Sequence, residues 1–208
     1  MMSWTAVIPV KRLETAKSRL GLAEDPRRPE LALAFALDVI HACLESASVS
    51  SVIVVTDDQE VIGAVSEVII CPEPLDGGLN GAIRAGAELA EGPTVVLAGD
   101  LPSLTSQALD YILAAAAQHS RSLLSDTQGS GTAMLLATDG RALSPHFGVK
   151  SRAAHVDAGY VDLALDEPAE IRTLIAGARR DVDTPADLWD ARRIGVGSHT
   201  AVVLGRQT

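Results

Sequence analysis

Short apolar runs alternate along this chain with longer segments in which apolar residues recur at helical spacing. A short apolar run bounded by turn residues is typical of a buried parallel strand, whereas an i, i+3, i+4 pattern indicates a helix. We predict strands at 5–10, 52–55, 68–71, 94–100, 122–125, 132–137 and 160–165, with a strand-like piece at Val182. We predict helices at 30–46, 59–65, 80–90, 106–118, 151–158, 167–176 and 185–193.

This alternation favours an α/β fold of three layers, in which helices cover both faces of a mostly parallel sheet. The chain has no internal repeat, long linker or low-complexity tract, so we expect a single domain over residues 1–208. The segment from about residue 195 is rich in glycine, and we expect it to be peripheral to the core.

Composition narrows the classes of function. The 208 residues are 47% apolar but only 3% aromatic, which suits a core of small aliphatic side chains. The net charge of −10 argues against a general binder of nucleic acid or anionic membranes, because both need a positive surface. No apolar run approaches the roughly 20 residues that span a bilayer, and the N-terminus lacks a signal-peptide pattern. We therefore expect a soluble cytoplasmic protein. A homodimer is one hypothesis for its oligomeric state.

The apolar run at 94–100 ends abruptly in Gly99-Asp100, and Pro102 follows. In open α/β sheets, ligands bind at the carboxyl ends of the strands. Asp100 is therefore predicted at the ligand-binding edge, where a carboxylate can hold a divalent cation against a phosphate.

A second acidic segment, at 181–188, reads Asp-Val-Asp-Thr-Pro-Ala-Asp-Leu. Thr184 and Asp187 are explained as the cap and first turn of a helix that begins at Pro185. Asp181 is not explained in this way. Because Mg²⁺ prefers one or two carboxylates together with phosphate oxygens and water, Asp100 and Asp181 are candidate ligands, and Asp183 is a further one.

Four cationic residues follow the first predicted strand: Lys11, Arg12, Lys17 and Arg19. Fixed positive charge offsets the repulsion between phosphate groups, so we interpret this loop as phosphate-binding, with a solvated basic loop as the alternative. The P-loop motif is absent, and no dinucleotide-binding fingerprint follows the first strand.

A third element joins a Gly-Ser-Gly-Thr segment at 129–132 with Phe147-Gly148 and Ser151. Ser151 is predicted to cap the following helix, and Gly148 allows close approach of a ligand to the backbone. Free N–H groups at a helix start suit an anion, and Lys150 and Arg152 add positive charge. A plain capped helix is the alternative.

The ordered set of motifs extends over nearly the whole chain: Ile8-Pro9-Val10-Lys11, Ala16-Lys17-Ser18-Arg19-Leu20, Gly78-Leu79-Asn80-Gly81-Ala82, Gly99-Asp100-Leu101-Pro102, Gly131-Thr132-Ala133, Phe147-Gly148 with Ser151, and residues 181–188. Together these motifs resemble the GTP-dependent guanylyltransferases of coenzyme F420 biosynthesis. That family joins GMP to 2-phospholactate, or to phosphoenolpyruvate in its actinobacterial branch. The resemblance implies a Rossmann-like nucleotidyltransferase fold with a mixed sheet.

The resemblance also implies roles for individual residues, which fall into three overlapping groups. The catalytic group is Lys17, Asp100 and Asp181, of which the two aspartates would hold Mg²⁺. The nucleotide-binding group is Lys11, Lys17, Thr56 and Asn80. The group that binds the acceptor phosphate is Thr132, Gly148 and Ser151.

The sequence identifies the metal site more clearly than it identifies the residues that read the base or the chemical identity of the acceptor. Thr56, Asp76 and Asn80 could read the guanine edge, but each is also explained as a turn or cap residue. The preference for GTP follows from the resemblance alone. No residue separates phosphoenolpyruvate from 2-phospholactate, although a composition rich in alanine and arginine and poor in lysine favours the actinobacterial branch.

Three alternatives remain open at this point. The chain could be another nucleotidyltransferase that acts on a pterin cofactor or on a sugar or polyol phosphate. It could be a sugar transferase, because Asp181-Val182-Asp183 forms an Asp-x-Asp motif. It could also be a non-catalytic GTP-binding regulator built on the same scaffold.

Overall fold

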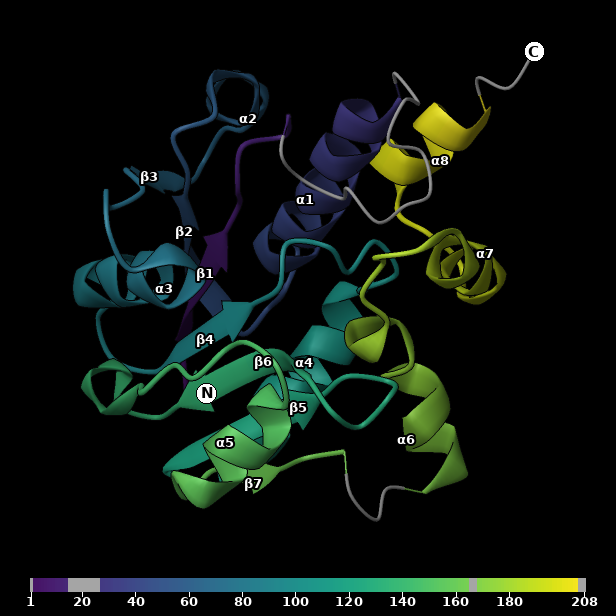
Figure 1. Ribbon diagram of the computed structural model, residues 1–208. Helices are drawn as coiled ribbons and strands as arrows, with labels where there is room; N and C mark the ends of the chain where they lie inside the picture. Colours follow the sequence, from purple (N-terminus) through teal and green to yellow (C-terminus); the bar gives the residue numbers. More distant parts are fainter. Residues whose placement is uncertain (1, 15–26, 165–167, 206–208) are drawn as a thin grey trace.

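The computed structural model describes residues 2–14, 27–164 and 168–205. Within these residues, seven strands form one sheet in the order β3-β2-β1-β4-β6-β5-β7 (Figure 1). The strands are β1 (Trp4–Pro9), β2 (Val49–Val55), β3 (Ile69–Cys71), β4 (Thr94–Leu97), β5 (Arg121–Ser125), β6 (Thr132–Ala137) and β7 (Val161–Asp162). Only β6 among them runs against its neighbours. The predicted mostly parallel α/β sheet is confirmed.

The helices in the described ranges are α1 (Arg28–Leu44), α2 (Gln59–Ala64), α3 (Gly78–Leu89), α4 (Ser106–Ala116), α5 (Ser151–Asp157), α6 (Ala169–Leu174), α7 (Pro185–Ile194) and α8 (Ser198–Gly205). The same ranges contain two short 3₁₀ turns, η1 (Gly140–Ala142) between β6 and α5, and η2 (Gly177–Arg179) between α6 and α7. Across the described residues, no helix combines the length and apolar character needed to cross a membrane.

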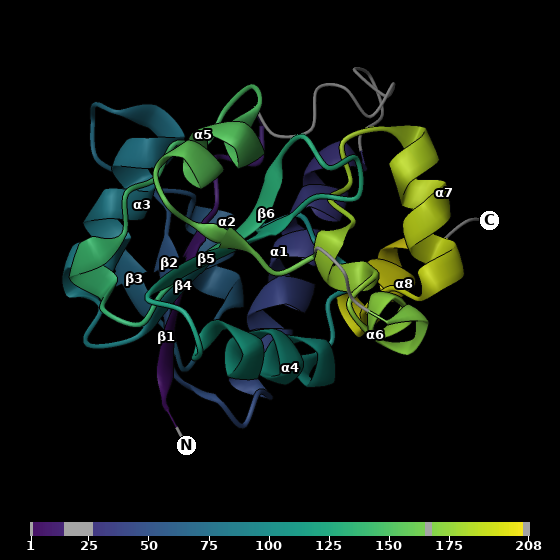
Figure 2. The ribbon, with the colours of Figure 1, turned by 90° about the horizontal axis from the view of Figure 1, so that it is seen from below.

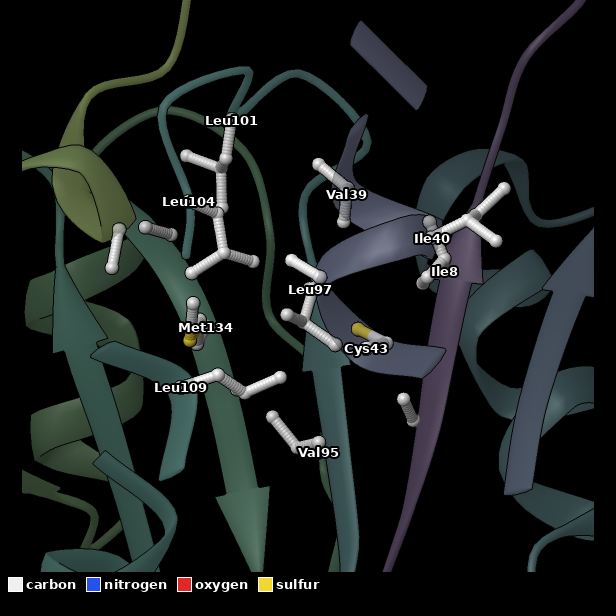
Figure 3. Packing of buried hydrophobic residues seen from close by; sticks show 14 of the residues in the cluster. Ile8, Val39, Ile40, Cys43, Val95, Leu97, Leu101, Leu104, Leu109 and Met134 are labelled. Atoms are coloured by element: carbon white, nitrogen blue, oxygen red, sulfur yellow. The ribbon is translucent and has the colours of Figure 1, made fainter. Parts of the chain in front are cut away.

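Alternate residues of the buried strands face opposite layers of helices. Ile8 and Leu97 belong to a cluster with residues of α1 and α4, which Figure 3 shows from close by. Val7 and Val96, one position away on the same strands, pack instead with residues of α3. Figures 1 and 2 show α3 on one side of the sheet and α1 with α4 on the other. Period-2 alternation with apolar residues on both faces thus produces the three layers.

Two strand predictions near the proposed site need correction. β4 ends at Leu97, and Asp100 lies in the turn that follows rather than on the strand. Val182 is fully buried, but it is not part of the sheet. Its N–H donates to the Asp100 carbonyl oxygen over 3.0 Å, so a single long-range hydrogen bond replaces the ladder of a strand.

The expectation of a peripheral tail does not hold for residues 195–205. Residues 198–205 form α8, which packs against α1 (Figure 1). Buried Asp38 of α1 accepts hydrogen bonds from the N–H groups of His199 (2.9 Å) and Thr200 (3.0 Å) at the start of α8. The tail joins the fold because this carboxylate satisfies N–H groups that a helix start leaves without partners.

Candidate active site at the carboxyl edge of the sheet

The two acidic motifs meet at the carboxyl edge of the sheet. The backbone hydrogen bond from Val182 to Asp100 brings Asp181 beside the turn that follows β4. Burial is the main cause that raises the pKa of Asp181 to about 6, and the neighbouring Asp100 carboxylate is the next. Asp183 and Asp126 act in the same direction. Like charges held this close are unfavourable unless a cation offsets them.

The segment that carries Asp181 is held from its other side by Arg179. The Arg179 side chain donates to the backbone carbonyls of Ser125 and Asp126, each over 2.8 Å. In return, the Thr127 N–H donates to the Arg179 carbonyl over 2.9 Å. These bonds fix the backbone just before Asp181 against the end of β5.

Asp187, the last acidic residue of the 181–188 motif, stabilises the start of helix α7 (Pro185–Ile194). Thr184 caps α7 by accepting from the Asp187 N–H, and Asp187 accepts from the Thr184 N–H over 2.9 Å, which completes a capping box. Arg180 lies 3.6 Å from Asp187 in an ion pair. The prediction that Thr184 and Asp187 are helix-start residues is therefore confirmed.

The residues present fit a magnesium ion only together with a substrate. Within the described residues, no group of three or more His, Cys, Asp or Glu side chains converges as a protein-only metal site. Asp100 and Asp181 offer hard oxygen ligands side by side. Two carboxylates that leave the other positions to phosphate oxygens and water match the way Mg²⁺ is usually bound.

Thr132 and Ser151, two of the predicted acceptor residues, are in direct contact. The Ser151 hydroxyl donates to Thr132 Oγ1 over 3.2 Å, and both residues are almost fully buried. Gly148 has a φ of +145°, and a Cβ there would meet no atom within 4 Å. The glycine is therefore needed for its backbone conformation, and the space beside it is open.

The predicted cap of α5 is wrong. Lys150 occupies the cap position with a left-handed φ of 57°, and Ser151 is the first residue of the helix. The Ser151 hydroxyl is directed to Thr132 instead of capping the helix. Arg152 is also engaged, because its Nε lies 2.6 Å from the buried Asp162 carboxylate.

The reversed direction of β6 places Thr132, a predicted acceptor residue, at the edge of the sheet that carries the acidic pair. Leu97 at the end of β4 pairs with Met134 near the start of β6, and the Ala98 N–H donates to the Ala133 carbonyl over 3.1 Å. Thr132 therefore begins its strand at the edge where β4 ends. The charge of Asp126 helps to raise the pKa of Asp181, and the Asp126 carboxylate also accepts a hydrogen bond from the N–H of Gly131 over 2.9 Å.

The predicted nucleotide-binding residues have varied surroundings. Lys11 is exposed just beyond β1, at the same edge. Thr56 is buried, and its hydroxyl accepts from the Asp58 N–H over 3.1 Å, as a turn residue does. The Asn80 carboxamide pairs with the backbone of Phe147 in both directions, at 3.0 and 2.8 Å. Lys17 lies outside the described residues.

Sequence reasoning missed two residues that hold this site. Arg179 gave no signal, because its partners are backbone carbonyls far away in the sequence. His155 did give one: it lies four residues after Ser151, so both belong to one face of the predicted helix. The structure shows His155 fully buried, with Nδ1 3.0 Å from Thr132 Oγ1.

Comparison with known proteins identifies the family. The profile described as "Guanylyl transferase CofC like" matches residues 4–164. The chain belongs to this family. Its curated relatives include a phosphoenolpyruvate guanylyltransferase of Streptomyces coelicolor, 43% identical over 214 residues that cover 99% of this chain and 97% of that protein. A protein of the same name from Mycobacterium leprae is 40% identical over 208 residues, covering 95% and 92%.

Solved structures of nucleotidyltransferases share the fold of this chain. A nucleotidyl transferase from Methanothermobacter has a TM-score of 0.62 at 19% identity, over 92% of this chain and 96% of its own. The 4-diphosphocytidyl-2C-methyl-D-erythritol synthase of Anaerococcus prevotii has a TM-score of 0.54 at 9% identity, over 92% and 95%. The predicted nucleotidyltransferase fold is confirmed, and membership of the CofC-like family makes this chain a guanylyltransferase.

Proposed function

We propose that this guanylyltransferase transfers GMP from GTP to the phosphate of phosphoenolpyruvate and releases pyrophosphate, as a step of coenzyme F420 biosynthesis. The observation that carries the proposal is that Asp100 and Asp181 meet at the same edge of the sheet as the paired hydroxyls of Thr132 and Ser151. An acidic pair for a metal–triphosphate and a hydroxyl pair for a second anion are what such a transfer needs at one edge. The names of the relatives support phosphoenolpyruvate over 2-phospholactate as the acceptor.

The transfer is an in-line displacement. A phosphate oxygen of the acceptor forms a bond to the α-phosphorus of GTP, and the bond from that phosphorus to the bridging oxygen of pyrophosphate breaks. A phosphate monoester has a second pKa near ~6, so it is largely a dianion at neutral pH and needs no general base. The main barrier is the repulsion between two polyanions, which positioning and charge neutralisation lower.

Each group of residues contributes to one part of this task. Asp100 and Asp181 would hold Mg²⁺, with Asp183 as a further candidate, and the ion when bound supplies charge neutralisation at the triphosphate. Lys11 and Lys17 would add positive charge from the loop after β1. Thr132 would donate a hydrogen bond to the acceptor, Ser151 would support it by donating to Thr132 Oγ1, and Gly148 leaves room for the acceptor.

A panel assay tests the proposal. Purified protein is incubated with Mg²⁺, each of the four NTPs and each candidate acceptor, and pyrophosphate release is recorded. We expect turnover with GTP and phosphoenolpyruvate, and slower turnover with 2-phospholactate in direct competition. Preferred turnover with CTP or with a sugar phosphate would favour another nucleotidyltransferase, and GTP binding without any turnover would favour a regulator.

A further inference from the structure

His155 is a fully buried histidine in contact with the Thr132 hydroxyl of the proposed acceptor site. Its ring packs edge-on against Phe147, at 5.1 Å between ring centroids, and against Tyr160, at 5.5 Å. These aromatic neighbours fix the plane of the imidazole. Each ring nitrogen therefore has a defined partner.

The backbone determines which nitrogen of His155 carries the proton. The backbone N–H of His146 donates to His155 Nε2 over 2.9 Å. Because a backbone N–H can only donate, Nε2 is unprotonated. Burial, followed by the nearby His146, lowers the pKa of His155 to about 4, while a hydrogen bond between the imidazole ring and the backbone of Ser151 opposes this shift. The ring is therefore neutral near physiological pH, with its single proton on Nδ1.

This tautomer sets the direction of the hydrogen bonds at Thr132. Nδ1–H donates to Thr132 Oγ1 over 3.0 Å, and the Ser151 hydroxyl donates to the same oxygen over 3.2 Å. A hydroxyl oxygen has two acceptor positions and one hydrogen. Neither contact uses the hydrogen of Thr132, so that hydrogen is available to a third group.

We propose that His155 is a positioning residue that makes the Thr132 hydroxyl a hydrogen-bond donor toward an anionic oxygen of the phosphorylated acceptor. The inference rests on the proposed function, because it takes the acceptor site at Thr132 as given. Ionised phosphate and carboxylate oxygens only accept hydrogen bonds, so a donor that is already oriented binds them without reorganisation. With the opposite tautomer, Thr132 would donate its hydrogen to the imidazole instead.

Two amide variants separate the two nitrogens. In His155→Asn, the side-chain NH₂ lies near the position of Nδ1 and can still donate to Thr132. In His155→Gln, the longer side chain reaches the position of Nε2 and can accept from His146, but the donor to Thr132 is lost. Both changes remove the ring, so a role in packing alone would affect both variants alike. Thermal unfolding and circular dichroism establish that each variant is folded.

Steady-state kinetics give the decisive comparison. We expect His155→Gln to raise the KM for phosphoenolpyruvate about tenfold, the factor typical of one hydrogen bond to a charged group. The KM for GTP should stay unchanged, and His155→Asn should keep an acceptor KM close to that of the parent protein. Equal acceptor KM values in the two variants, or an equal rise in the KM for GTP, would overturn the inference.

A double-mutant cycle with Thr132→Val tests whether His155 acts through Thr132. If it does, His155→Gln should add little once the hydroxyl is gone, whereas independent effects would multiply and contradict the inference. Failure of the proposed function can be told apart from failure of this inference. If the proposed function is wrong, the parent protein itself shows no turnover with phosphoenolpyruvate. If only the inference is wrong, the parent protein is active and the acceptor KM does not differ between the two His155 variants.

Discussion

At the scale of single residues, Asn80 shows how a side chain suited to base recognition can serve another partner. Its carboxamide both donates to and accepts from the backbone of Phe147, the residue before Gly148. A carboxamide matched to a peptide group in this way ties α3 to the proposed acceptor loop. We therefore infer that Asn80 supports the loop, and its role in reading guanine stays a prediction.

Replacing Asn80 by alanine distinguishes the two roles. If Asn80 supports the loop, the KM for the acceptor should rise about fivefold to tenfold, since two hydrogen bonds to Phe147 are lost, while the KM for GTP stays constant. Glu88→Ala, at an exposed position on the same helix, is the matched control. A raised KM for GTP or weaker discrimination against ATP, with an unchanged acceptor KM, would instead support base reading.

His155 also makes stability depend on pH. Its pKa is lowered to about 4 in the folded protein from an ordinary 6.5, so the unfolded chain binds the proton more tightly. Stability is therefore complete above pH 6.5 and is lost as pH falls toward 4. The ring faces His146 and Tyr160, and Arg121 lies over Tyr160.

The difference between the parent protein and His155→Asn isolates this contribution, because asparagine does not titrate. Between pH 7 and pH 5, the parent protein should lose about 2 kcal/mol more unfolding free energy than the variant. Urea unfolding at the two pH values measures both losses. Parallel pH profiles would show that the fold does not depend on a neutral His155.

At the scale of elements, periodicity predicted the helices α1 to α7 but missed α8, and it did not show what each helix contacts. The segment from about residue 195, which includes α8, was predicted to be peripheral because it is rich in glycine. Gly197 instead allows close contact: a Cβ there would overlap the Asp38 carboxylate. Likewise, Ser151 has the side chain of a helix cap, and only the fold shows that its hydroxyl faces Thr132. Local sequence cannot encode these distant partners.

The contact between α1 and α8 can be tested through Asp38. Asp38→Ala removes an acceptor shared by two N–H groups and the His199 ring, so we expect it to lower the free energy of unfolding by about 2 kcal/mol. Glu45→Ala, at an exposed end of α1, should leave stability unchanged. Chemical denaturation compares the two variants, and equal stabilities would contradict a structural role for α8.

At the scale of the whole molecule, the site depends on strand order and direction. The alternating pattern was sufficient to predict a mostly parallel sheet with Asp100 near its carboxyl edge. It could not show that β6 is inserted between β4 and β5 in the opposite direction, which brings Thr132 to that edge. Nor could it show that Val182 bonds to the Asp100 turn. Both depend on pairings between residues far apart in sequence.

In the proposed mechanism, Asp100 and Asp181 act as one unit around a metal-bound triphosphate. Asp100→Asn, Asp181→Asn and the double variant keep the size of each side chain while removing its charge. Asp190→Asn, which removes a charge from the nearby helix α7, is the matched control.

The most direct measurement is the rate of pyrophosphate release from GTP and phosphoenolpyruvate in these four variants. We predict that each single change at Asp100 or Asp181 lowers kcat/KM at least ~100-fold, the scale of a lost electrostatic group in an active site. The double variant should be little worse than either single variant, and Asp190→Asn should match the parent protein. A rate near that of the parent protein in either Asp100→Asn or Asp181→Asn would show that the two carboxylates do not hold the metal ion.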